Sequence, residues 1–99
     1  LAGYEATFML RAPKDAKIGI MAACKMPNEW QGEHTRWFTL AASEKPRALT
    51  VKTDYKAHTL AITLDRKTHA FETADMCGGL YLALEKTQTM LYHVKITAL

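Results

Sequence analysis

Apolar and polar residues alternate with a period of two along most of the chain, and turn-forming residues separate the alternating segments. In the segment YEATFMLR, for example, Tyr4, Ala6, Phe8 and Leu10 share one face. Such alternation is typical of β-strands that bury one face. Eight short segments of this kind follow one another with little helical periodicity. The pattern predicts an all-β fold, either a small antiparallel β-sandwich or a partly open barrel of about seven to eight short strands.

The segment 57–75 predicts a β-hairpin with Arg66 and Lys67 at its tip. In this register Ile62 lies opposite Phe71, so that apolar side chains meet across the two strands. The tip lacks the Asn-Gly or Asp-Gly pair that tight hairpin turns favour, which leaves the turn geometry open.

The segment 79–99 predicts a second hairpin with its loop at 86–88, in which Leu82 lies opposite Tyr92 and Leu80 opposite Val94. This register brings the apolar residues of the two strands together. Residues 79–93 also include good helix formers, so a helix is the alternative for this stretch.

The composition indicates one folded domain, residues 1–99, since 48% of the residues are hydrophobic and 23% are charged. No apolar run approaches the roughly 20 residues that a membrane-spanning helix needs. The chain begins at Leu1 without a signal-peptide pattern. We therefore expect either a mature chain after processing or a trimmed terminus.

Two cysteines bear on the location of the protein. Cys24 ends a predicted strand on its apolar face, and Cys77 directly precedes Gly78-Gly79. A disulfide between them would join strands far apart in the sequence and contribute about 4 kcal/mol in the chain-entropy model. We therefore predict a Cys24–Cys77 disulfide and an extracytoplasmic location, periplasmic or secreted. Two buried thiols in a cytoplasmic protein are the alternative.

Candidate chemistry for an enzyme is sparse. The predicted hairpin places His58 opposite Asp75, close to Cys77, which would resemble an activated thiol. Nothing in the sequence supplies the remainder of such a site, and the histidines do not have the spacing of metal ligands. We expect no catalytic residues, no metal and no cofactor.

The most site-like stretch is the predicted loop MPNEWQGEHTRW, which holds both tryptophans of the chain. Tryptophan and arginine are enriched at interface hot spots, and loops often carry binding residues. We expect Trp37 to alternate into the core and Trp30 to anchor a contact surface. The alternative for Trp30 is that it folds back as a lid over the core. The candidate binding residues are Asn28, Glu29, Trp30, Gln31, His34 and Arg36.

These features favour a non-catalytic protein-binding module, such as an inhibitor, an immunity-type protein or a surface-assembly protein. We expect the partner to be another protein. The alternative is a small cytoplasmic β-barrel that binds nucleic acid, with carbohydrate binding as a third hypothesis. The net charge of +3 is spread along the chain rather than clustered, which disfavours nucleic acid. The cations that would contact phosphates in that alternative are Lys52, Lys56, Arg66, Lys67 and Lys95.

Overall fold

The computed structural model describes residues 2–23, 35–72, 79–84 and 89–99. These residues form eight antiparallel strands in two sheets, so the predicted all-β sandwich is confirmed. The strands are β1 (Tyr4–Arg11), β2 (Ala16–Ala23), β3 (Thr35–Leu40), β4 (Arg47–Asp54), β5 (Thr59–Leu64), β6 (Lys67–Glu72), β7 (Gly79–Leu84) and β8 (Met90–Ala98).

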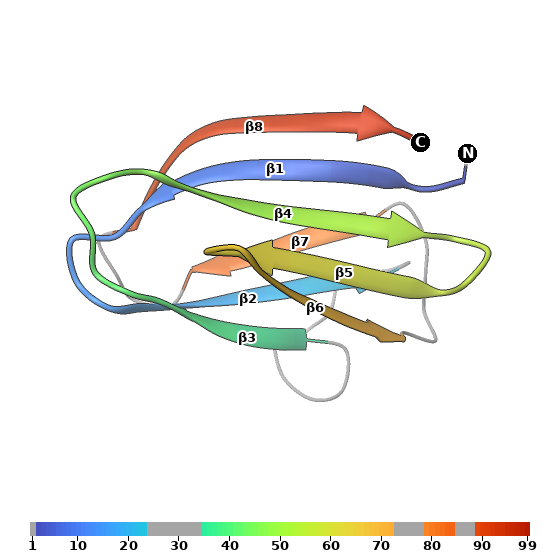
Figure 1. Cartoon of the computed structure of the whole chain (residues 1–99), viewed down its shortest axis with the longest axis horizontal. Coiled ribbons are helices and arrows are strands. Elements are labelled where there is room, and N and C mark those ends of the chain that lie inside the picture. Colours follow the sequence, from blue (N-terminus) through green and yellow to red (C-terminus); the bar gives the residue numbers. More distant parts are fainter. Residues whose placement is uncertain (1, 24–34, 73–78, 85–88) are drawn as a thin grey trace.

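The two sheets differ in width. The larger has the strand order β6-β5-β4-β1-β8, and the smaller has the order β3-β2-β7. Figure 1 shows β8 and β1 side by side at one margin of the larger sheet, with the smaller sheet behind the others. As a result, β8 and β7 are edge strands, and so are β6 and β3.

The hydrophobic core lies between the sheets and is built from the alternating residues that the sequence pattern identifies. In β1, every second residue from Tyr4 to Leu10 is buried. Burial of apolar area of this kind is the main favourable term in folding. The core residues are Tyr4, Ala6, Phe8, Leu10, Ala12, Ala16, Ile18, Ile20, Leu40, Leu49, Val51, Leu60 and Ile62.

The β5–β6 hairpin is confirmed, but the predicted register is wrong by two residues. Leu64 pairs with Lys67, and Ile62 pairs with His69 rather than Phe71. The tip is therefore Asp65-Arg66, and both residues adopt positive φ, 52° and 66°. Two such residues form a turn whose twist matches that of the flanking strands, which explains why this tip is used.

The predicted hairpin between the last two strands is wrong, and so is the helical alternative for 79–93. β7 pairs with β2 in the smaller sheet, whereas β8 pairs with β1 in the larger one. The apolar residues of β7 face Ile18 and Ile20 across the ladder, and those of β8 face Ala6 and Phe8. Each strand therefore finds an apolar neighbour, but in a different sheet.

The two ends of the described chain are hydrogen-bonded to each other. The Leu99 amide donates to the Gly3 carbonyl at 3.0 Å, and the Ala2 amide donates to the Leu99 carbonyl at 3.1 Å. The Tyr55 amide donates to the Ala2 carbonyl at 2.9 Å. The two bonds of Leu99 extend the β1–β8 ladder beyond its last pair, Tyr4 with Ala98, and the Tyr55 bond lies on the β4 side of β1. The backbone of β8 is thus held along its whole length.

Candidate functional site

Most of the predicted binding loop, residues 26–37, lies outside the described residues. This applies to Asn28, Glu29, Trp30, Gln31 and His34, and also to Cys24 and Cys77 with their predicted disulfide. Arg36 is described: it lies in β3 opposite Ile20 of β2 and is half-buried. Since Ile20 faces the core, Arg36 lies on the core-facing side of β3.

The expectation for Trp37 is wrong. Phe38 packs against the core, and Trp37 alternates to the opposite, outer face of the smaller sheet, where it is 42% exposed. Its partner across the ladder is Gly19. Period-two alternation fixes only that neighbours point to opposite faces, and either Trp37 or Phe38 could have taken the core position. In the structure the smaller ring, that of Phe38, takes the core position.

The strand β8 provides the clearest departure from ordinary burial. All nine of its residues are exposed. Val94 pairs with the buried Phe8, and Ile96 pairs with the fully buried Ala6. Directly opposed residues point to the same face of a sheet, so Val94 and Ile96 face the core side. Nevertheless Val94 is 42% exposed and Ile96 is 66% exposed.

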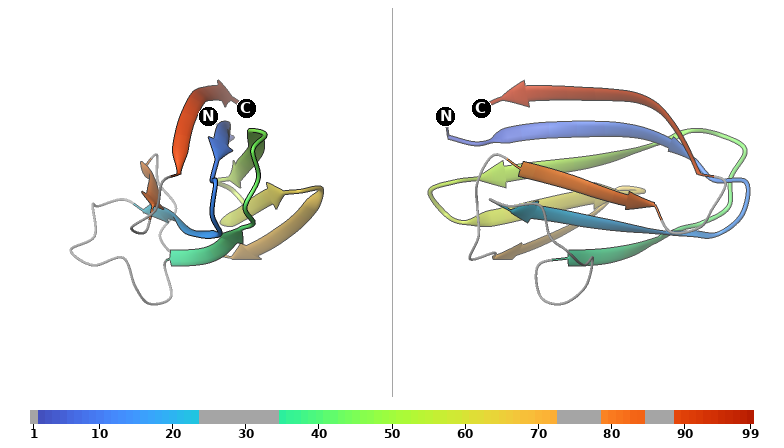
Figure 2. Two further views of the ribbon diagram at one scale, coloured as in Figure 1. Left: turned by 90° about the vertical axis from the view of Figure 1, so that its left-hand side faces the viewer. Right: turned by 180° about the vertical axis from the view of Figure 1, so that it is seen from behind.

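The unequal width of the sheets explains this exposure. A small pocket lined by Phe38 of β3 and His69 of β6 shows that β3 lies across from β6. At the other end of the smaller sheet, β7 therefore lies on the side of β8. The end-on view in Figure 2 shows the free edges of β7 and β8 on this same side of the sandwich. Here the larger sheet extends past the smaller one, and nothing among the described residues covers β8.

The exposed apolar side chains of this region come from both edge strands. Leu84 of β7 pairs with the buried Ile18 and thus faces the core, yet it is an exposed residue. We refer to the region as the β7–β8 seam. It consists of Leu84, Leu91, Val94 and Ile96, together with the free backbone edge of β8.

A β-bulge lies in the first half of β8. Leu91 pairs with Leu10, and His93 pairs with Met9, so Tyr92 is one extra residue in β8 at this point. Bulges are common at sheet edges, where they increase the local twist. Tyr92 is exposed, and its hydroxyl donates to the Met90 sulfur at 3.7 Å. The bulge keeps apolar residues on the core-facing side along both halves of the strand.

The outer face of β8 is basic. Its side chains are His93, Lys95 and Thr97, which pair with Met9, Thr7 and Glu5 of β1. The stretch from Thr89 to Leu99 contains no Asp or Glu. Among the residues that the structure describes, the ion pairs join Arg11 to Glu44 and Arg47 to Asp65, and Lys95 belongs to neither. The seam therefore combines an apolar core-facing side with an outer side that carries the positive charge of Lys95.

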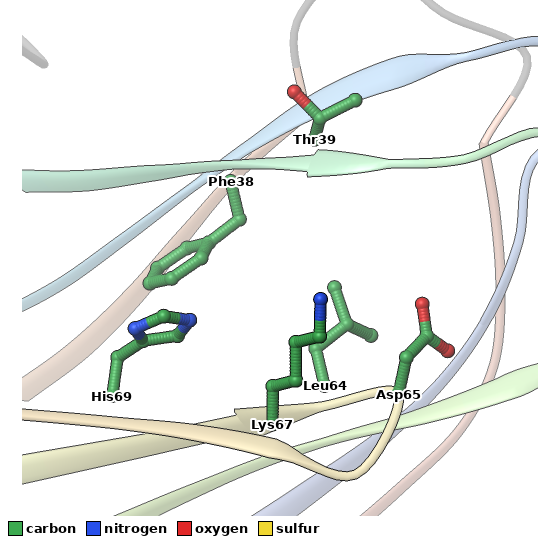
Figure 3. Close-up of a pocket in the computed structure, with 6 residues that line it drawn as sticks. All are labelled: Phe38, Thr39, Leu64, Asp65, Lys67 and His69. Atoms are coloured by element: carbon green, nitrogen blue, oxygen red, sulfur yellow. The ribbon is translucent and has the colours of Figure 1, made fainter.

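A pocket of about 210 Å³ lies at the opposite side of the sandwich, between β3 and the β5–β6 hairpin. Figure 3 shows Phe38 pointing toward His69, whose ring centroid is 5.8 Å away. The pocket is smaller than the roughly 300–1,000 Å³ of typical ligand sites. Asp65, its acidic group, is held by Arg47 at 2.8 Å. The pocket therefore has the features of an imperfectly filled sheet margin rather than of a ligand site.

The histidines His58 and His69 lie in different elements of the described structure. His58 lies in the turn between β4 and β5, and His69 lies in β6 opposite Ile62. The proposed partners of His58, Asp75 and Cys77, are outside the described residues. Within the described ranges, no three His, Cys, Asp or Glu side chains gather closely enough to hold a metal ion.

The cations of the nucleic-acid alternative do not gather on one surface. Lys56 lies in the turn after β4, whereas Arg66 lies at the opposite end of β5. A strand of this length separates them by roughly 20 Å. Lys95 lies on β8, four strands away from Lys67 of β6. The basic stripe that phosphate binding favours is therefore not formed by these five residues.

The seam residues were not identified as a site from the sequence. The sequence does contain the relevant signal, an apolar strand without a single acid at 89–99, but it does not show that this strand is an edge. The described part of the chain also includes no helix that is long and apolar enough to cross a membrane. No protein-family model, no curated protein and no solved structure matches this chain.

Proposed function

We propose that the protein is a protein-binding module that acts through the β7–β8 seam. One observation carries the proposal: Ile96 faces the core side of the larger sheet opposite the fully buried Ala6, and it is nevertheless 66% exposed. A core-facing apolar row without cover marks a contact surface on an otherwise folded domain.

The free backbone of β8 supports the same proposal. An edge strand presents unpaired amide and carbonyl groups, which can bind a strand of another chain through a continuous ladder. Natural proteins usually shorten or cover such an edge. Here the edge strand runs from Met90 to Ala98, the longest strand among the described residues, and is held by β1 and the terminal hydrogen bonds. A rigid acceptor of this kind loses little entropy on binding.

The proposal retains the non-catalytic character and moves the contact surface from the loop of Trp30 to the seam. It also retains an extracytoplasmic location, which depends on the Cys24–Cys77 disulfide. Mass measurement after alkylation, with and without prior reduction, tests that part. Two thiols that become accessible only after reduction support it, and two freely labelled thiols count against it.

The binding function is tested by charge insertion at the seam. We compare co-purification of partners with the wild-type chain, Ile96→Asp and Thr68→Asp. Thr68 is exposed at the opposite edge of the same sheet, in β6, so it controls for a new carboxylate on an edge strand. Binding that is lost in Ile96→Asp and kept in Thr68→Asp supports the proposal. Binding that survives in both folded variants contradicts it.

A further inference from the structure

We propose that the occupant of the β7–β8 seam is one extended strand of another protein, in which apolar residues alternate with Asp or Glu. This inference rests on the proposed function and specifies the chemistry of the partner. It follows from the two faces of β8, which differ in character: Val94, Ile96 and Ala98 face the core side, and His93 and Lys95 face outward.

The core-facing side of β8 determines where the partner strand needs apolar residues. A strand that pairs with the free edge of β8 places every second side chain on the same side as Val94 and Ile96. These side chains would extend the apolar row of Val94 and Ile96 on the side of the larger sheet that the smaller sheet leaves uncovered. Apolar residues there bury their own surface together with that of Ile96. Polar residues there would leave the apolar surface of Val94 and Ile96 in contact with water.

The outward side determines the acidic half of the pattern. The intervening side chains of an added strand would lie opposite His93 and Lys95. On the β1 side, Lys95 faces the uncharged Thr7, and the acid nearest along β1 is Glu5, opposite Thr97. Opposite charges that face each other across strands are stabilising, and like charges are destabilising. Carboxylates in the added strand therefore complement this edge.

A second copy of β8 does not satisfy the same requirement. In an antiparallel pair of identical strands around a two-fold axis, residues of the same face must oppose each other. If the two-fold axis passes through Val94, Lys95 lies opposite His93. If it passes through Lys95, the two lysines oppose each other, and if it passes through Ile96, Lys95 lies opposite Thr97. None supplies an acid, because residues 89–99 contain none. Lysine on an edge is a common protection against self-pairing.

The test uses three synthetic nine-residue peptides and the full chain. The first alternates Val and Glu, the second alternates Val and Lys, and the third has the composition of the first with its valines and glutamates grouped. Binding is followed by residue-resolved NMR, including amide hydrogen exchange in β8. We expect the Val–Glu peptide to bind and to slow exchange at alternate amides of residues 90–98. We expect the other two to bind at least threefold more weakly.

A charge-reversal pair separates a local effect from a general one. Lys95→Glu should weaken the Val–Glu peptide about threefold to tenfold and strengthen the Val–Lys peptide. Lys52→Glu changes the net charge equally, but Lys52 lies on the outer face of β4, away from the seam. It should leave the order of the peptides unchanged.

Three outcomes would overturn the inference. The peptides could bind equally well or not at all, Lys95→Glu could behave as Lys52→Glu does, or the chain could form a dimer that Ile96→Asp dissolves. Each of these removes the alternating acidic partner. None of them bears on the proposed binding function, which the Ile96→Asp variant tests separately.

Discussion

The indole of Trp37 lies face-on against the backbone of Gly19. A Cβ atom added to Gly19 would lie 3.0 Å from Cη2, 3.0 Å from Cζ3 and 3.1 Å from Cε3 of that ring. Three adjacent ring atoms at nearly equal distance mean that the ring presents its face, because an edge-on approach would bring one atom much closer than its neighbours. Gly19 thus provides the space in which the tryptophan covers the outer side of the smaller sheet.

Gly19→Ala should therefore destabilise the protein by about 1 kcal/mol, at the low end of the cost of overpacking, because the partly exposed ring has to shift by a few tenths of an ångström. Urea denaturation measures this change, and tryptophan fluorescence reports the displacement. In a Trp37→Ala background the same substitution should cost much less, because the obstructing ring is gone. An equal cost in both backgrounds would show that the ring is not the cause.

The alternation of apolar and polar residues was sufficient to predict the strands and most of the core, as in β1, where the buried residues are the ones that alternate. It could not distinguish which neighbour in β3 faces inward, because Trp37 and Phe38 are both apolar. The decision depends on what lies across the ladder, and Gly19 is distant in the sequence.

The seam could not be predicted for a related reason. Pairing Leu82 with Tyr92 was plausible in sequence because both strands carry apolar rows. The real neighbours are Ile20 for Leu82 and Leu10 for Leu91. Strand pairing over such distances depends on the whole fold, whereas alternation specifies only the face. Because the edge position and the exposure of β8 follow from its pairing, they could not be predicted from the sequence either.

Exposed and buried isoleucines should respond very differently to truncation. Ile62→Ala removes a fully buried core side chain and should cost about 2–5 kcal/mol. Ile96→Ala, with the same chemistry in an exposed position, should change the free energy of unfolding by only about 0.5 kcal/mol. Chemical denaturation of the two variants gives both values. A large loss in Ile96→Ala would mean that this residue is covered within the monomer.

The start of β1 depends on the hydroxyl of Thr53. This hydroxyl accepts from the Tyr4 amide at 3.0 Å and donates to the Tyr4 carbonyl at 3.3 Å, in a buried setting. Thr53→Val keeps the shape and leaves the Tyr4 amide without this acceptor, which should cost about 1–3 kcal/mol. Thr50→Val is a suitable comparison, because Thr50 is only partly buried and shares a weak 3.5 Å contact with Thr7. Similar costs for both variants would contradict the assignment.

Alkaline pH should destabilise the protein through Tyr4. Burial, and in second place the nearby Tyr55, raises the pKa of the Tyr4 hydroxyl to about 12 from its ordinary value of 10.0. Between these values the unfolded tyrosine ionises while the folded one stays neutral, so stability falls as the pH rises from about 10 to about 12. Its hydroxyl also has no hydrogen-bond partner among the described residues.

Tyr4→Phe should therefore be tolerated at pH 7 and should lose less stability than the wild type above pH 10. Urea denaturation at pH 7, 10 and 11.5 measures the difference. If both proteins lose the same amount of stability, Tyr4 is not the titrating group.

Photo-crosslinking tests whether the β7–β8 seam contacts another protein. A benzophenone amino acid is placed at Ile96 or, as the control, at Thr68 on the opposite edge of the larger sheet, and each chain is irradiated in the cells that produce it. We expect a discrete adduct with another protein from position 96 and none from position 68. No adduct at 96, or the same adducts at both positions, would contradict a binding function for the β7–β8 seam.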